Sequence, residues 1–182
     1  MFRPACPSTI PRCPPVRSGA RGFTLVELMV TLSVMVVVTL LLLPGMADFN
    51  ARNRIIALEG DLLSAVALAR SEAARNGVPV LLVAASGGVT GNAYAGGWSL
   101  VLDSDGDGTA DASETVLRVR EALSGDLKLD GSSPITFGTT GFLSPASAVT
   151  LTICRRDGDT RGVTVTVTPS GQTDSTAITT CS

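Results

Sequence analysis

Twelve residues from Asp103 to Glu114 combine acidic side chains and glycines in a spacing that suits a calcium ion. The segment reads Asp103-Ser104-Asp105-Gly106-Asp107-Gly108-Thr109-Ala110-Asp111-Ala112-Ser113-Glu114 and fulfils every position of the calcium-loop pattern D-x-[DN]-x-[DN]-G-x5-E. The expected ligands are the carboxylates of Asp103, Asp105, Asp107, Asp111 and Glu114 and the carbonyl oxygen of Thr109. Because the flanking residues favour strands, this is not an EF-hand, and a solvated hairpin loop is the alternative. Calcium affinity is expected to be weak, with a dissociation constant of about 10⁻⁴–10⁻³ M as in extracellular modules.

A second polar group consists of Arg155, Arg156 and Arg161, which surround a predicted turn at Asp157-Gly158-Asp159. So few phosphate contacts would support only weak, salt-sensitive binding of nucleic acid. The alternative is that these arginines pair with Asp157, with Asp159 or with a neighbouring subunit.

The composition argues against an enzyme and against a general nucleic-acid binder. The 182 residues suit one domain plus an anchor, and they include no histidine, so that no Ser-His or Cys-His catalytic pair exists. The formal charge is −2, but the first 22 residues hold four arginines and no acidic residue. Without them the chain has 10 basic and 16 acidic side chains, a balance near −6. A general nucleic-acid binder would show a basic balance.

The first predicted element along the chain is an apolar run from Phe23 to Leu43. Its 21 residues are enough to cross a bilayer as a helix, and Glu27 is the one charge among them. A carboxylate at mid-bilayer costs roughly 2.5–3.5 kcal/mol, so Glu27 is expected to have a function. The upstream arginines orient the N-terminus towards the cytoplasm. A secretory signal cleaved before Asp48 and a plain transmembrane anchor are the alternatives, and both leave Glu27 unexplained.

The residues Gly22-Phe23-Thr24-Leu25-Val26-Glu27 resemble the cleavage and methylation signature of type IV pilins and pseudopilins. The resemblance implies that a prepilin peptidase cuts after Gly22, which makes residues 1–22 a leader peptide, and that Phe23 becomes the N-methylated first residue. It also implies that Glu27 pairs with the terminal amine of a neighbouring subunit. A buried carboxylate requires such a cation.

Further along, Leu62-Leu63-Ser64-Ala65, Ala69-Arg70-Ser71-Glu72-Ala73 and Val78-Pro79-Val80 resemble the GspH/FimT family of minor pilins and pseudopilins. That resemblance implies a structural subunit that assembles with other pilin or pseudopilin subunits into a type II secretion pseudopilus or a type IV pilus. It implies a single-pass protein of the bacterial inner membrane, with a cytoplasmic N-terminus and a periplasmic C-terminal domain. Some FimT proteins bind DNA for uptake through a Gly-Arg-x-Arg stretch. The comparable Gly171-Gln172-Thr173-Asp174 has no arginine, so DNA is not an expected partner. A FimT-like minor pilin that binds DNA for uptake is the alternative function.

The four cysteines divide between two compartments. Cys154 and Cys181 lie in the exported part, where a disulfide persists, and their bond would close 27 residues of chain. Such a crosslink contributes roughly 3–4 kcal/mol in chain-entropy estimates. Cys6 and Cys13 fall in the leader and are expected to be incidental.

The predicted architecture is α+β and pilin-like: a leader at 1–22, a helix over 23–76 with a membrane-spanning segment at 23–43, and a β-rich domain at 77–182. Pro44-Gly45 predicts a kink or local melting of the helix. Beyond it, apolar residues recur every three or four positions at Ile55, Leu58, Leu62, Val66, Ala69 and Ala73, which predicts a stripe that docks the domain. The polar helix residues Arg70 and Glu72 are expected to be solvated or paired locally.

After Gly77 the apolar period changes to two. Strands are predicted at Val78–Ala84, Gly97–Leu102, Thr115–Arg120, Ile135–Phe137, Val149–Cys154 and Gly162–Thr168, with a short last strand near Ala177–Cys181. They are expected to form an antiparallel sheet that Trp98 anchors against the helix.

Overall fold

The computed structural model describes residues 22–155 and 161–181, without the side chains of residues 42–48. Residues 1–21, which hold most of the predicted leader with Cys6 and Cys13, lie outside the described residues, as does the predicted turn at Asp157-Gly158-Asp159. The chain divides into two compact units, Met1–Gly45 and Met46–Ser182. One helix, α1 (Leu25–Asn76), runs through both units, and its backbone stays helical at Pro44-Gly45, so the predicted melting is not observed.

The first part of α1 is a helix without a core around it. Every side chain from Leu25 to Leu41 is exposed, and most of them are large and apolar. Three hydroxyl groups in this stretch bond back to the preceding turn: Thr31 donates to Leu28 O (2.9 Å), Ser33 to Met29 O (2.8 Å) and Thr39 to Met35 O (2.7 Å). Within the described residues, no helix combines the length and the apolar character that crossing a membrane requires.

The second part of α1 has one buried face. All six residues of the predicted apolar stripe are buried, with exposed fractions of 7% at Ile55 and 0% at the other five positions. They form one hydrophobic core with residues from both sheets. The sequence therefore predicted the docking face of the helix correctly.

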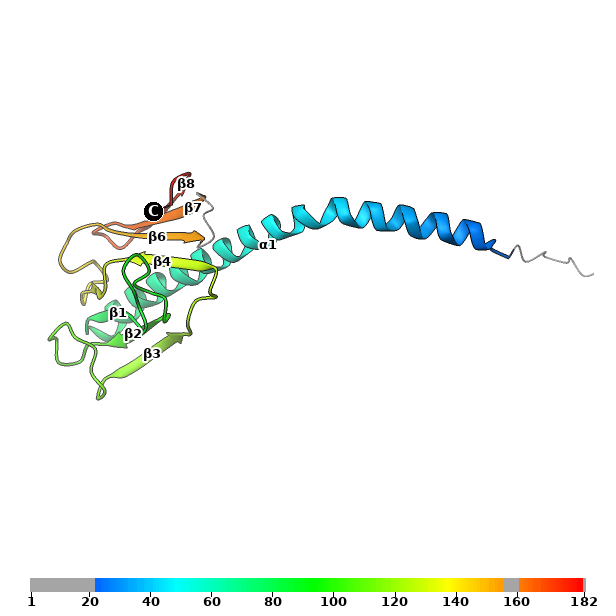
Figure 1. Ribbon diagram of the computed structural model, residues 1–182. Coiled ribbons are helices and arrows are strands. Elements are labelled where there is room, and N and C mark those ends of the chain that lie inside the picture. Colours follow the sequence, from blue (N-terminus) through cyan, green and yellow to red (C-terminus); the bar gives the residue numbers. More distant parts are fainter. Residues whose placement is uncertain (1–21, 156–160, 182) are drawn as a thin grey trace, which may run out of the picture. The chain divides into compact units, whose positions relative to one another are not determined.

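Within residues 22–155 and 161–181, eight strands form two antiparallel sheets that pack on this part of α1 (Figure 1). The first sheet has the order β3-β2-β1-β5, with β1 at Val80–Ala84, β2 at Trp98–Leu102, β3 at Thr115–Arg120 and β5 at Ile135–Phe137. The second has the order β4-β6-β7-β8, with β4 at Leu127–Gly131, β6 at Val149–Arg155, β7 at Gly162–Val167 and β8 at Thr173–Ile178. The predicted α+β class is confirmed, although the strands divide into two sheets where one was expected.

Trp98 is buried in the core that α1 shares with both sheets, as expected of a residue that anchors a sheet against the helix. It is 1% exposed, and the ring of Tyr94 meets it edge-on at a centroid distance of 6.4 Å. The guanidinium of Arg120 stacks over the indole at 4.9 Å and also pairs with Asp61 of α1 (Nε to Oδ2, 3.1 Å). This cluster ties the edge strand β3 to the helix.

Two strands differ from the prediction. The strand β4 was not predicted, yet it pairs with β6 over its whole length and adds Leu127 and Leu129 to the core. The last strand, β8, begins at Thr173 rather than near Ala177, and it ends before Cys181.

Candidate functional site

The N-terminal end of α1 is organised by Thr24. The Oγ1 atom of Thr24 accepts a hydrogen bond from Glu27 N (3.2 Å), and Thr24 O accepts from Leu28 N (3.1 Å). Thr24 is thus the N-cap residue, and Glu27 occupies the third helical position. Thr-x-x-Glu is the sequence signature of a capping box, so this role was readable from the sequence and was missed there.

Glu27 and Phe23 both face solvent in the single chain. Phe23 is 80% exposed, and the carboxylate of Glu27 has no partner among the described residues. A carboxylate in the first turn interacts favourably with the positive end of the helix dipole. Within the part of the chain that the structure describes, the carboxylate of Glu27 is therefore available for a cation.

The acidic segment Asp103–Glu114 connects β2 to β3 as a closed loop. Asp103 is only 2% exposed, and its two carboxylate oxygens accept from Gly106 N (2.8 Å) and Gly108 N (3.1 Å). At the other end, Glu114 accepts from Ser104 N (2.9 Å) and Asp111 N (3.0 Å). The first and last acidic residues of the calcium pattern thus fold the loop back on itself.

Two sets of three carboxylates in this loop could hold a metal ion. Asp103, Asp105 and Glu114 form one set, and Asp105, Asp107 and Asp111 form the other, with ligand oxygens within 4.8 Å of one another in each. Calcium takes oxygen ligands at about 2.3–2.6 Å, so two ligands on opposite sides of an ion lie roughly 5 Å apart. Hydrogen bonds from the hydroxyl and the backbone N–H of Thr109 lower the pKa of Asp107, which keeps that carboxylate ionised. The donor set and its spacing fit calcium.

Of the predicted basic cluster, the structure describes only Arg155 and Arg161. Arg156 lies outside the described residues. Arg155 ends β6 and is half-buried, Arg161 precedes β7 and is exposed, and neither residue is without a partner. Arg161 lines a largely apolar groove of about 340 Å³ between α1 and the last two strands, together with Ile55, Ile56 and Ile178.

Cys154 and Cys181 form the predicted disulfide, with their Cα atoms 5.9 Å apart. The bond joins the end of β6 to the segment that follows β8. A methyl group built on Gly162 would lie 2.6 Å from the sulfur of Cys181 and 3.1 Å from that of Cys154, so no side chain fits at this position.

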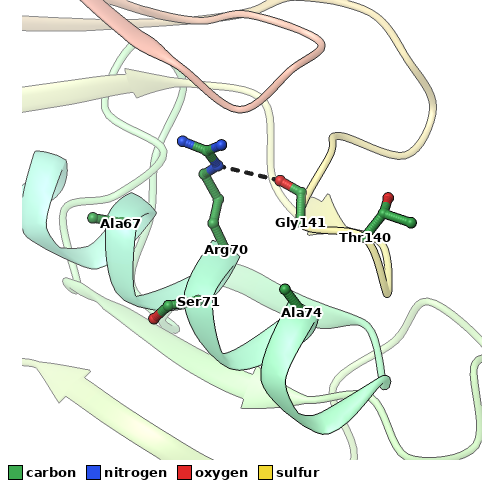
Figure 2. Close-up of a pocket in the computed structure, with 6 residues that line it drawn as sticks. All are labelled: Ala67, Arg70, Ser71, Ala74, Thr140 and Gly141. Carbon is green, nitrogen blue, oxygen red and sulfur yellow. Dashed lines mark hydrogen bonds between the residues drawn. The ribbon is translucent and has the colours of Figure 1, made fainter.

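Arg70 does not behave as the sequence indicated. Its side chain neither pairs locally nor extends freely into solvent; it crosses from α1 to the loop after β5, where Nε donates to Gly141 O (3.2 Å). It also passes directly beside Gly171 in the turn between β7 and β8, where any Cβ atom would collide with it. This side chain lines a cleft of about 350 Å³ together with Ala67, Ser71, Ala74, Thr140 and Gly141. Figure 2 shows these six residues and the hydrogen bond from Arg70 to Gly141. Glu72, in contrast, pairs locally with Arg75 as expected (2.6 Å).

A capped N-terminal helix with an acidic third position, packed through its second half on antiparallel sheets, is the arrangement of the pilin-like class of proteins. Two family profiles match the sequence. The profile described as "Prokaryotic N-terminal methylation motif" covers residues 17–43, and that described as "Type II transport protein GspH" covers residues 60–171. The chain belongs to the GspH family.

Solved structures share the fold at low sequence identity. The type IV minor pilin FimU of Pseudomonas aeruginosa in one crystal form superposes with a TM-score of 0.59 at 20% identity, over 74% of this chain and 99% of that chain. A second crystal form of FimU gives a TM-score of 0.54 at 19% identity, over 68% and 96% of the two chains. The minor pseudopilin EpsH of Vibrio cholerae gives 0.49 at 15% identity, over 68% and 97%. No curated protein sequence matches the chain significantly.

Proposed function

We propose that this protein is a minor pilin or pseudopilin, a structural subunit without catalytic activity that assembles with other pilin-like subunits. The observation that carries the proposal is the sequence Phe23-Thr24-Leu25-Val26-Glu27 at the start of a helix whose first part exposes apolar side chains throughout. Such a surface is stable only in lipid or against other apolar helices. Membership of the GspH family supports the same function.

In the proposed function the protein is first anchored in the membrane and is then incorporated into a filament. The segment 23–43 first anchors it in the inner membrane with the C-terminal domain in the periplasm, and a prepilin peptidase removes residues 1–22. Phe23 then carries the N-methylated amine. In the filament, whether a pseudopilus or a type IV pilus, the Glu27 carboxylate of one subunit pairs with the terminal amine of another and sets the axial register between their helices.

Substitution of Glu27 tests this proposal. We expect Glu27→Ala to leave cleavage after Gly22 intact, because the substitution keeps the helix apolar, and to impair incorporation into filaments. Mass spectrometry of the N-terminal peptide measures cleavage, and immunoblotting of sheared filaments measures incorporation.

Thr31→Ala is a suitable control, because it removes a polar group of the same stretch that is already satisfied within the helix. Normal incorporation of Glu27→Ala would contradict the register role. A mature chain that begins at Asp48 would contradict the whole proposal and favour a secretory signal.

No observation favours the alternative of a DNA-binding minor pilin. The turn at Gly171–Asp174 carries no arginine of its own, and Arg155 and Arg161 already have partners within the structure. We therefore do not assign DNA as a partner.

We further propose that the loop Asp103–Glu114 binds calcium weakly. Its support is the complete ligand pattern together with the two sets of converging carboxylates. Isothermal titration of the full chain in detergent is expected to give a dissociation constant of about 10⁻⁴–10⁻³ M. Asp105 belongs to both carboxylate sets, so Asp105→Ala, which removes the ligand oxygens, should abolish the heat, whereas Asp174→Ala on the exposed strand β8 should not change it. The absence of heat at millimolar calcium would end this assignment.

A further inference from the structure

We propose that the cleft between α1 and the loop at Thr140-Gly141 is a docking site for an acidic side chain of another pilin-like subunit, and that Arg70 binds its carboxylate. The inference rests on the proposed function, because only an assembled subunit has such neighbours.

Arg70 has hydrogen-bond donors that the described residues of its own chain do not use. A guanidinium carries five N–H donors, and one of them, on Nε, is taken by Gly141 O at 3.2 Å. In the part of the chain that the structure describes, no carboxylate pairs with Arg70. By contrast, Arg54, Arg75 and Arg120 pair with Asp126, Glu72 and Asp61. A half-buried cation without a counter-charge is unfavourable, and a carboxylate from outside would relieve that cost.

The guanidinium is also held in place before any partner arrives. The bond to Gly141 fixes it on one side, and the backbone of Gly171 packs against Nε and Cδ on another. Gly171 has a φ of 75°, which favours glycine, and a side chain there would displace Arg70. Because the arginine is already ordered, binding a partner costs less conformational entropy.

The other helix residues that line the cleft are small enough to let a neighbouring subunit come close to α1. Ala67, Ser71 and Ala74 are small, exposed residues on one side of α1 (Figure 2). The hydroxyl of Ser71 already donates to Leu68 O (2.9 Å), so it places no unsatisfied donor in the cleft. Small side chains let a neighbouring backbone come near the helix, as they do at tight helix interfaces.

The charge of the cleft selects a carboxylate. Arg70 is the one charged residue among the six that line it. A nucleic acid or a lipid surface is held by several cations in a row, whereas a single planar guanidinium matches one carboxylate in a two-pronged pair. An aspartate or glutamate on another subunit therefore fits this site best.

Photo-crosslinking in cells that assemble the filament tests the site. Thr140 is exposed on the loop wall of the cleft, so a p-benzoylphenylalanine residue in its place reports what occupies it while leaving the helix wall unchanged. The expected adduct joins this chain to another pilin-like subunit, through a peptide that contains an acidic residue.

Three variants sharpen the test. Arg70→Gln removes the charge, and the adduct should fall by roughly tenfold or more, as for loss of a charge-assisted hydrogen bond. Ser71→Leu fills the cleft from an exposed position while Arg70 itself is kept, and it should have the same effect. It therefore tests the site even if Arg70→Gln lowers the melting temperature. Arg52→Gln removes an exposed arginine elsewhere on α1 and should leave the adduct unchanged.

A second probe position separates failure of the cleft from failure of the proposed function. A photo-reactive residue at Leu32, in the exposed apolar part of α1, should crosslink to pilin-like subunits in every variant. If Leu32 reacts with them and Thr140 does not, or if the Thr140 adduct persists in both Arg70→Gln and Ser71→Leu, the cleft assignment is wrong. Adducts at Thr140 only with lipid would also overturn it. If neither position captures a pilin-like subunit, the proposed function itself fails.

Discussion

Gly162 has no side chain because two sulfur atoms and a carbonyl oxygen fill the space beside it. A Cβ atom there would lie 2.6 Å from Cys181 Sγ and would also overlap Ile153 O, which belongs to the paired strand β6 and cannot move aside. We expect Gly162→Ala to lower the free energy of unfolding by about 1–3 kcal/mol through overpacking. It should also raise the number of free thiols in the unreduced protein.

Gly60 provides a matched control for this prediction. It lies inside α1, and a Cβ atom there would meet nothing within 4 Å. Gly60→Ala should therefore raise the free energy of unfolding by about 0.5–1 kcal/mol, the usual gain in a helix interior. Denaturant unfolding and thiol titration of both variants measure the contrast, and equal effects would rule out the steric explanation.

Tyr94 gives the stability of the protein a defined dependence on alkaline pH. Burial raises the pKa of its phenol from 10.0 to about 12, and the hydroxyl donates to Ser132 O at 2.6 Å. The folded protein therefore holds this proton more tightly than the unfolded chain. The free energy of unfolding should be unaffected by this group below pH 10 and should fall as the pH rises from 10 to 12.

Tyr94→Phe isolates that effect. The variant loses the hydrogen bond to Ser132, which should cost about 1 kcal/mol at neutral pH, but it should also lose the alkaline decline that the phenol causes. Urea unfolding at pH 8 and at a pH between 10 and 12 compares the two proteins. An equally steep decline in Tyr94→Phe would assign the pH dependence to another group.

At the scale of elements, the sequence predicted a helix or strand correctly where the segment itself showed a regular spacing of apolar residues. The stripe from Ile55 to Ala73 and the strands with alternating valines are recognisable without knowledge of their partners. The strand β4 is not, because it is five residues long and contains Lys128, Asp130 and Gly131, which disfavour strands. Pairing with β6, a contact between segments distant in the sequence, makes it a strand.

The strand β8 was misplaced for a related reason. Its residues Thr173 to Ala177 are exposed and mostly polar, so they carry no apolar period. The strand exists because its backbone pairs with all of β7 at the edge of the sheet. An edge strand with polar side chains on both faces gives a sequence pattern that matches a loop.

The candidate sites divide in the same way. The acidic loop and the signature at Gly22–Glu27 are continuous in sequence, so their spacing alone was enough to predict them as candidate sites. The role of Arg70 depends on Gly141, which is 71 residues away along the chain, and on Gly171 beyond it. No local pattern records where such loops meet a helix.

At the scale of the whole molecule, the hydrophobic core lies entirely in the second compact unit. All described core residues fall between Ala51 and Val167, whereas the large apolar side chains from Phe23 to Leu41 are exposed. We expect a chain that begins at Met46 to keep its melting temperature within a few degrees of the full chain and to remain soluble without detergent. Circular dichroism and size-exclusion chromatography check both points, and a large loss of stability would show that the first unit supports the core.

The hydroxyls of Thr31, Ser33 and Thr39 each donate a hydrogen bond to a backbone carbonyl of their own helix. These groups therefore need no partner from outside, whether lipid or other helices surround this stretch. A transfer from one to the other would break no hydrogen bond of these groups, so they give neither environment an advantage. Under the proposed assembly, the directionality of that transfer has to come from other groups, and Glu27 is the one charged side chain between Phe23 and Leu43.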